Sequence, residues 1–543
     1  MALLAFSPHV LIGALFVGTI LVPVIILVNL AWRLCSNASI PNNISWVGVG
    51  STGGPLSRAR ANLASVCGLK ALMDEGYYKY SKRNQAYVLP HVLTGPEVVL
   101  PPSQMRWLLE QPDSVLSQTE VNRRFLEADH TFPHPNIVRE PVHPAVIRRE
   151  LGAGRLGCFA AGIADELDRC FREGWGVDAE RWREVRVYDT VLDAISRLSV
   201  RALVGEELCR NEEFLSCARR FDKNVVVSAA ALNLLPGFLK PIFAPIVTAY
   251  DKMLYRRFSK HVMPIIQERL RESDDKQSDD RPTQKNDYFD WAISHAKAHW
   301  DPTELSPDVM AGRLACLCFA AIQSSVISLT NALFDLAASP AHSAQWFDAM
   351  RDEVLLQQQD ETTTKATTTT TKAAPPWASK AALARLRHVD SALRESMRLS
   401  GFVARGVMKS VVAPGGVRLP DGTRLPRGAT VGVQAYSVHR DEDVYGGAAE
   451  YRPFRFVEPP GGEREKQQPQ ALVSTSPTFL AFSHGPNACP GRFFAANQLK
   501  LALAYIALHY EIEPITERPT NKWFVGSIAA PMWETLKIRR RKC

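Results

Sequence analysis

One short loop near the C-terminus contains residues suited to binding a metal through sulfur. Gly485 and Gly491 flank Cys489, and a helix is expected to begin just after the cysteine. Glycine lets backbone N–H groups approach a sulfur atom, and the positive end of a following helix lowers the pKa of a thiol. Phe482 can shield the sulfur from water. We predict that Cys489 is a thiolate metal ligand; a buried structural cysteine is the alternative.

The spacing of this loop, Phe-x-x-Gly-x-x-x-Cys-x-Gly, resembles the signature of the cytochrome P-450 family. Three upstream segments resemble the family in the right order: Glu395-x-x-Arg398, His439-Arg-Asp441, and Pro-Phe-Arg-Phe with its arginine at Arg455. A Glu/Arg pair three residues apart is common on solvated helix faces and carries little by itself. The ordered set of four motifs carries the resemblance, which extends over nearly the whole chain.

The resemblance implies a cytochrome P-450-like fold, mainly α with a minor β-sheet, and haem b as cofactor. Cys489 is then the axial ligand of the iron, and Phe482, Gly485 and Gly491 shape the loop that holds it. A thiolate donates electron density to the iron and favours cleavage of the oxygen–oxygen bond. The implied activity is an NADPH- and O2-dependent monooxygenase.

The central helix departs from the family pattern of an acid followed by Thr. The matching stretch runs from Ala320 to Ser325 and has Gln323 and Ser324 at those two positions. Ser324 can hold a water and relay a proton, whereas Gln323 has no proton to supply. The alternative for Ser324 is a hydrogen bond to the backbone carbonyl one turn earlier. We assign Ser324 and Gln323 to the catalytic region.

The haem carboxylates also need partners. Asn487 stands where the family often has Arg or His, so other residues must supply the positive charge. Arg405, after the second predicted helix, is the first candidate. His143 and Arg148 resemble an early helix contact of the family, although their spacing is five rather than four. A solvated surface arginine is the alternative for Arg148.

The N-terminus predicts a membrane anchor. Val10 to Trp32 is uncharged, and its 23 residues would span about 34 Å as a helix. Because basic residues follow this run and none precedes it, we expect a single pass with the catalytic domain in the cytosol, at the endoplasmic reticulum. The predicted organisation is an anchor at 1–35, a hinge linker at 36–54 and a haem-thiolate catalytic domain at 55–543.

Periodicity predicts the main elements. A buried helix is expected at 307–336, with Ser306 available as its cap, a second at 379–399 and a third at about 489–509. The stretch 403–438 has the pattern of β-strands split by turns.

Composition sets further limits. The net charge is +8 over 543 residues, and no basic block is interleaved with aromatic residues, so nucleic acid is not an expected partner. Cys316 and Cys318 are interpreted as small core residues. The polar segments 272–286, 357–376 and 458–477 are interpreted as surface insertions.

The partners follow from the resemblance and from apolar patches. A separate NADPH-cytochrome reductase is expected, with a cytochrome b5-type donor as a further candidate, because the sequence has no Gly-rich dinucleotide loop. Residues 229–245 and 401–403 are apolar and favour a lipophilic small-molecule substrate and contact with membrane lipid. The chain resembles fungal members that tailor secondary metabolites. The alternatives are a reductase-independent haem-thiolate isomerase or dehydratase, and a non-catalytic haem-binding sensor.

Overall fold

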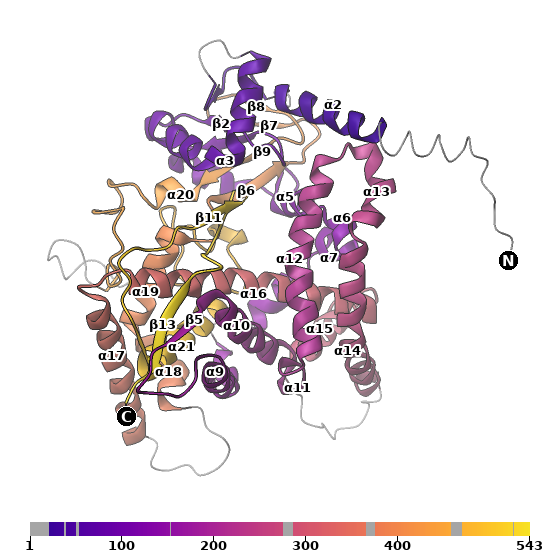
Figure 1. Cartoon of the computed structure of the whole chain (residues 1–543). Coiled ribbons are helices and arrows are strands. Elements are labelled where there is room, and N and C mark those ends of the chain that lie inside the picture. The colour runs from indigo at the N-terminus through magenta and orange to yellow at the C-terminus, as the bar shows by residue number, and fades with distance from the viewer. Residues whose placement is uncertain are drawn as a thin grey trace. The chain divides into compact units, whose positions relative to one another are not determined.

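The computed structural model describes residues 21–36, 40–49, 54–152, 154–274, 286–364, 375–457, 470–524 and 526–542. The chain forms two compact units. Figure 1 shows their helices and strands. The first unit comprises Met1–Thr131, Val225–Tyr250 and Met408–Val433. The second comprises Phe132–Asn224, Asp251–Val407 and Gln434–Cys543. Helices predominate and the sheets are small, as predicted.

A six-stranded sheet forms the centre of the first unit. Its order is β1 (Ser45–Trp46), β2 (Tyr87–Leu89), β3 (Glu97–Leu100), β9 (Thr430–Gln434), β6 (Arg405–Val411) and β4 (Leu116–Ser117). The β2 and β3 strands pair antiparallel, whereas β3 and β9 pair parallel with Val98 opposite Val431. Every residue of β2 and β3 is buried, as expected for short apolar and β-branched runs covered on both faces.

Helices and turns complete this unit. They are α2 (Val22–Cys35), α3 (Pro55–Lys79), η2 (Ser81–Arg83), η3 (Pro102–Gln104), α4 (Met105–Glu110), α5 (Gln118–Phe125), α6 (Ala128–Thr131), η5 (Gly237–Leu239), α13 (Lys240–Val247) and the hairpin β7 (Val417–Arg418) and β8 (Arg424–Leu425). The last carbonyls of α2 accept hydrogen bonds from α3: Asn62 Nδ2 donates to Leu34 O at 2.9 Å and Arg58 Nε to Cys35 O at 3.1 Å. The carbonyl groups at the end of α2 have no partner within the helix, and these hydrogen bonds from α3 satisfy two of them.

The predicted anchor is only partly described. Residues 1–20 lie outside the described residues, and α2 covers the rest of the apolar run with 14 residues, about 21 Å, which alone is short of a bilayer core. Among the described helices only α16 (Pro307–Ala337) is long and apolar enough to cross a membrane. Since 72% of its most apolar window is buried in the protein, α16 is a core helix.

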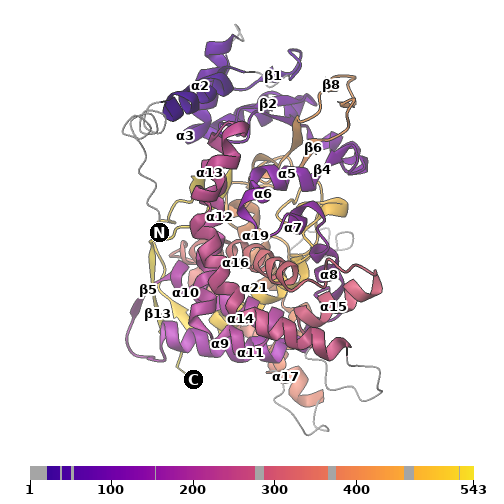
Figure 2. The ribbon, with the colours of Figure 1, turned by 90° about the vertical axis from the view of Figure 1, so that its right-hand side faces the viewer.

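The second unit is arranged around α16. This helix packs against α10 (Val187–Val204), α19 (Arg387–Ser400) and α21 (Arg492–His509), and Figure 2 shows it passing among them. Its bounds confirm the helix predicted at 307–336. An apolar surface on nearly all sides explains this position, because only neighbours on every side can remove it from water.

The other elements of the second unit surround this core. The helical ones are α7 (Asn136–Arg139), α8 (His143–Glu150), η4 (Leu156–Phe159), α9 (Ala160–Trp175), α11 (Glu206–Cys209), α15 (Tyr288–Ala298), α17 (Ser343–Thr364), η6 (Pro376–Ala378), α18 (Lys380–Arg385), α20 (Ala435–Val438) and η8 (Gly485–Asn487). The strands are β5 (Arg183–Arg186), β10 (Tyr510–Ile512) and β13 (Thr535–Arg540) in one sheet, and β11 (Lys522–Phe524) and β12 (Ser527–Ala529) in another. Two long helices, α12 (Glu212–Leu234) and α14 (Ala249–Asp274), have residues in both units.

The prediction of a single helix at 379–399 is wrong. Leu386, with ψ of 82°, breaks it into α18 and α19. A carboxylate from another helix stabilises the break: Glu353 of α17 accepts hydrogen bonds from the backbone N–H groups of Arg387 (2.6 Å) and His388 (3.0 Å). An anion at a helix N-terminus satisfies free N–H groups and the helix dipole, and periodicity cannot reveal a partner so distant in sequence.

Smaller differences concern element ends. The Ser306 side chain makes no capping hydrogen bond, so that prediction is wrong. The third helix begins at Arg492, which leaves Cys489 in the loop before it. The 403–438 stretch contains β6 to β9 as expected but ends in the short helix α20. Residues 275–285, 365–374 and 458–469, which are parts of the predicted insertions, lie outside the described residues.

A buried charge cluster joins α19 to the segment at 439–455. Arg398 Nε and Nη2 donate to the two carboxylate oxygens of Glu395 at 2.7 and 2.8 Å, and Arg455 Nε donates to Glu395 Oε1 at 2.9 Å. The structure therefore brings together the three residues that the motifs singled out. Arg398 also donates to the carbonyl oxygens of Ala448 (2.8 Å) and His439, so that the guanidinium has partners on all sides.

His439 extends this cluster to the loop. Its Nδ1 lies 3.1 Å from Arg398 O, and its Nε2 accepts the backbone N–H of Leu480 at 2.8 Å. Burial, with the charges of Arg440 and Arg398, lowers the pKa of His439 to about 3, so the ring is neutral. A neutral ring with the proton on Nδ1 satisfies both hydrogen bonds. His439 thus couples α19 to the residues just before the cysteine loop.

We expect Glu395→Gln to destabilise the fold by about 3–5 kcal/mol, because it leaves the Arg398 charge buried without its carboxylate. Urea unfolding followed by circular dichroism measures this loss. The matched control is Glu450→Gln, which breaks an exposed pair with Arg452 and should cost less than about 1 kcal/mol. Equal losses for the two variants would contradict a structural role for the buried pair.

Candidate active site

The cysteine loop has a defined backbone. Gly485 has φ of +74°, which a side chain would strain, so the glycine is required by conformation. Ser483 also has a positive φ, +59°, although its side chain disfavours this conformation. The chain then closes on itself, because the Cys489 N–H donates to Phe482 O at 2.9 Å. Phe482 is buried at the other side of this closure, consistent with its predicted shielding role.

The Cys489 thiol is enclosed but not sealed off. The backbone N–H groups of Gly491 and Arg492 hydrogen-bond the sulfur, as the glycine spacing suggested, and the side chain remains partly accessible. Burial nevertheless raises the pKa of the Cys489 thiol, and these two hydrogen bonds and the Arg492 charge only oppose the rise. The lowered pKa predicted from sequence is therefore wrong for the thiol itself. A cation bound to the sulfur is what would hold it as thiolate.

The centre of α16 has one accessible stripe. Ala320 is exposed, and Cys316, Phe319, Gln323 and Ser324 are partly exposed; of the residues between them, Leu317, Cys318 and Ile322 are buried and Ala321 is partly exposed. The spacing of three and four residues places all five on one helical face. Cys316 therefore belongs to this stripe, whereas Cys318 is core as predicted. Small side chains give this face room for another molecule.

The two catalytic candidates on this stripe have different partners. Ser324 Oγ donates to Ala320 O at 3.1 Å, which is the backbone alternative described above. Gln323 Oε1 accepts a hydrogen bond from the Tyr188 hydroxyl at 2.8 Å. No sequence motif indicates Tyr188, which comes from α10, 135 residues earlier.

His143 reaches the same stripe from α8. Its Nε2 lies 3.7 Å from Cys316 Sγ, and its Nδ1 accepts from Arg313 Nη1 at 3.1 Å. Burial and the Arg313 charge lower the pKa of His143 to about 3, so the ring is neutral. Arg313, missed in the sequence, is buried and paired with Glu304 (Nε to Oε2, 2.5 Å). Arg313 therefore places a buried, paired positive charge beside His143.

The two arginine candidates lie in different places. Arg148 is exposed, and its Nη2 donates weakly to Pro486 O at 3.4 Å, which brings it beside the cysteine loop. Arg405 opens β6, and its guanidinium lies against Gly526: a Cβ on that glycine would come within 3.0 Å of Nε. A side chain at position 526 would displace Arg405, so this glycine keeps room for the guanidinium.

The residues fit a haem in their chemistry. Cys489 offers sulfur with two N–H groups supporting it, and Arg148 offers positive charge beside the same loop for a carboxylate. The α8 helix packs on the loop as well, since Ile147 Cγ2 lies 3.9 Å from where a Cβ on Gly491 would be. No group of three or more His, Cys, Asp or Glu residues within the described ranges could hold a metal ion without such a cofactor.

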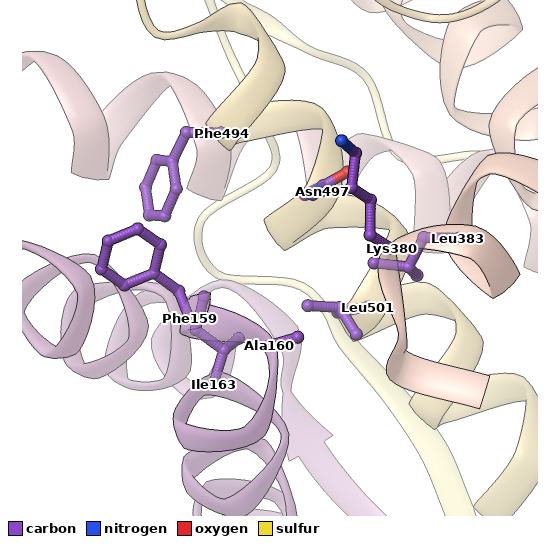
Figure 3. A pocket seen from close by; sticks show the side chains of 8 residues that line it. All are labelled: Phe159, Ala160, Ile163, Lys380, Leu383, Phe494, Asn497 and Leu501. Atoms are coloured by element: carbon purple, nitrogen blue, oxygen red, sulfur yellow. The ribbon is translucent and has the colours of Figure 1, made fainter. Parts of the chain in front are cut away.

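A separate apolar pocket lies between α9, α18 and α21 (Figure 3). Phe159, Ile163, Phe494 and Leu501 line it, with Lys380 among the other lining residues. Its cavity volume is about 10 Å³, which is about one water probe. This pocket is too small for a haem or a lipophilic substrate.

Comparisons with known proteins find similarity to one protein family. Residues 163–531 match the family model described as cytochrome P450. The chain is 30% identical to cytochrome P450 monooxygenase gloP of Glarea lozoyensis over 92% of this chain and 91% of that protein. It is 31% identical to cytochrome P450 monooxygenase htyF of Aspergillus rugulosus (90% and 70%), and 32% identical to cytochrome P450 monooxygenase 71 of Postia placenta (87% and 89%).

We expect Cys489→Ala to lose the ferrous–CO absorption that is diagnostic of thiolate ligation, because no other cysteine whose side chain the structure describes lies in a loop between two glycines. A difference spectrum of the purified variant measures it. Cys170→Ala, which removes a buried thiol of α9, is the control and should keep the band. A Cys489→Ala protein with the wild-type band would remove Cys489 from its role.

Proposed function

The chain belongs to the cytochrome P450 family and is an oxidoreductase of the monooxygenase type, and from this we propose that it inserts one oxygen atom from O2 into a lipophilic small molecule. The observation that carries the proposal is Cys489, held by the N–H groups of Gly491 and Arg492. When bound there, a haem would supply oxygen activation, and the thiolate would favour cleavage of the oxygen–oxygen bond. The chain's own residues would supply ligation, placement and protons.

Electrons are proposed to come from NADPH through a separate reductase, with a cytochrome b5-type protein as a further donor. The relatives are monooxygenases of fungi, and this supports a role in tailoring a secondary metabolite. The apolar segment 401–403 supports a lipophilic substrate: Val403 is exposed, and Phe402 O accepts the N–H of Ile528, so β12 holds this segment in place.

A second candidate is a reductase-independent isomerase or dehydratase acting on an oxygenated substrate. Two observations favour it: Gln323 takes the place of the acid, and the Ser324 hydroxyl donates to Ala320 O. In this alternative the chain would need neither electron delivery nor protons for O2. The two candidates therefore differ in whether O2 and NADPH are consumed.

We also propose that the first unit contacts the endoplasmic reticulum membrane. Leu27, Val28 and Trp32 of α2 are exposed, as are Ile242 and Ile246 of α13. The two apolar segments are joined, because α2 donates hydrogen bonds to the end of α12, just before η5 and α13: Asn29 Nδ2 lies 3.4 Å from Leu234 O, and Arg33 donates to Asn233 O. Such an apolar face is costly in water and favourable in the acyl boundary of a bilayer.

The proposed function predicts that, with a reductase and NADPH, the product carries one atom of ¹⁸O from ¹⁸O2. Mass spectrometry of extracts from strains with and without the protein identifies the substrate, and the purified pair then gives the label. Unlabelled product formed without NADPH would instead establish the isomerase or dehydratase.

We expect deletion of residues 1–35 to release most of the protein from microsomes, with residual binding through the apolar face of η5 and α13. Adding Phe238→Asp and Ile242→Asp should abolish the remainder, as measured by flotation with vesicles. The control is Val177→Asp, an exposed apolar residue of the second unit, which should leave binding unchanged. Full pelleting of the truncated protein would contradict a dominant N-terminal anchor.

A further inference from the structure

A hollow at the end of the sheet that contains β10, β13 and β5 is lined mainly by basic residues (Figure 1). Its cavity volume is about 200 Å³. Because a single water needs only about 10–15 Å³, the hollow has room for a small anion. The lining residues are Ala179, Arg351, Glu511, Arg539, Arg540, Arg541 and Lys542. Five of these seven are basic and one is acidic, so the hollow attracts negative charge.

Three of the basic lining residues have carboxylate partners. The pairs are Arg539 Nε with Glu511 Oε2 (2.6 Å), Arg541 Nη2 with Asp348 Oδ1 (2.9 Å) and Lys542 Nζ with Glu180 Oε1 (2.8 Å). Arg539 and Glu511 are also direct neighbours in the pairing of β13 with β10. These pairs compensate three of the five positive charges, and two arginines of the lining remain.

Arg351 of α17 is the first of these two. Its Nε is buried and has no hydrogen-bond partner among the described residues. The nearby acids of its own helix are turned to other groups: Asp348 pairs with Arg541, and Glu353 accepts backbone N–H groups of α19. Asp352 is exposed and is rotated by about 100° around the helix. A buried N–H without an acceptor is costly, so Arg351 calls for an acceptor that no described residue provides.

Arg540 of β13 is the second. Its Nη1 donates to the Tyr505 hydroxyl at 3.1 Å, and its guanidinium carbon lies 5.0 Å from the centre of the Tyr510 ring. Burial raises the pKa of both phenols, which are therefore neutral. Asp168 accepts from the same Tyr505 hydroxyl but is paired with Arg172 at 2.8 Å. The phenols orient the Arg540 guanidinium without compensating its charge.

A network that only stabilises the fold has a different balance of charge. On α10, Arg197 has carboxylate oxygens of three residues within 3.1 Å of its guanidinium nitrogens, from Asp193, Glu173 and Glu212. The hollow has the opposite ratio, with basic residues in excess. Like charges gathered at one place repel one another, and an anion between them removes that repulsion.

We propose that this hollow is a binding site for a phosphate group and that Arg351 is its principal ligand. Guanidinium groups form parallel hydrogen bonds to phosphate oxygens. A phosphate monoester carries about −1.5 to −2 charges at pH 7, which matches the two uncompensated arginines, whereas one carboxylate would match only one of them. The bound group would join β13 to α17. The lining includes no residue of the cysteine loop, so the proposal is independent of the proposed oxygenase function.

Isothermal titration calorimetry of the full-length holoenzyme with inorganic phosphate, at about pH 7 and constant ionic strength, tests the proposal. Arg351→Gln removes the charge of the principal ligand. Ala179→Glu places a carboxylate in the lining, where it competes with phosphate. The control is Arg256→Gln, which removes an exposed arginine of α14. Circular dichroism and the ferrous–CO spectrum establish that each variant is folded.

We expect one saturable phosphate site in the wild type. Arg351→Gln should weaken binding at least about tenfold, as expected for lost hydrogen bonds to a charged group. Ala179→Glu should abolish binding and raise the melting temperature in phosphate-free buffer, because its carboxylate compensates the excess charge. Arg256→Gln should bind as the wild type does. Phosphate should raise the melting temperature of the wild type and leave that of Arg351→Gln unchanged.

A second titration identifies the source of the phosphate group. Dihexanoyl phosphatidic acid, kept below its micellar concentration, replaces inorganic phosphate. Tighter binding of this lipid than of phosphate, lost in Arg351→Gln, would support the proposal with a phospholipid headgroup as the ligand. Equal or weaker binding of the lipid would support a soluble phosphate compound.

Three results would overturn the proposal. The first is a wild-type protein without a saturable phosphate site. The second is an equal loss of affinity in Arg351→Gln and Arg256→Gln, which would show attraction by net charge alone. The third is wild-type affinity in Ala179→Glu, a result that decides the question even where Arg351→Gln does not fold.

Discussion

The buried carboxylate of Glu395 is the constraint on which the cysteine loop depends. A carboxylate removed from water needs charged partners in a fixed geometry, and Arg398 and Arg455 provide them. Arg398 in turn binds backbone carbonyls of the segment at 439–450, and His439 receives the N–H of Leu480. Leu480 O accepts the N–H of Ser483, where the loop to Cys489 begins. The position of the sulfur is therefore set by a charge that does no chemistry.

The α16 helix has apolar sides that pack in the core and one accessible stripe that carries polar residues. Its apolar sides make it the core of the second unit, yet one stripe carries Gln323 and Ser324. Polar groups inside a protein need protein partners, and each of these residues finds its own. Ser324 donates to the carbonyl one turn back, whereas the Gln323 Oε1 accepts from Tyr188 of another helix. The chemistry of this helix therefore depends on residues far away in the sequence.

Low dielectric surroundings decide which of these groups carry charge. Burial holds His143 and His439 in the neutral form, with pKa values of about 3, so each imidazole acts as a hydrogen-bonding group. The same effect raises the pKa of the Cys489 thiol despite two backbone N–H groups. Iron bound to the sulfur would stabilise the thiolate and offset the cost of burying its charge. Binding of the cofactor would therefore also stabilise the folded loop.

The sequence by itself determined the features that depend on residues close together in the chain. The bounds of α16 follow from helical periodicity, whereas the Cys489 loop and the cluster of Glu395, Arg398 and Arg455 were expected from motifs that resemble a known family. The structure decided what depends on packing between distant segments. Glu353 divides a predicted helix at Leu386, Arg313 places a positive charge beside His143, and Tyr188 donates to Gln323. Local spacing fixes neighbours within a few turns, whereas burial and partner choice arise only when separate helices pack together.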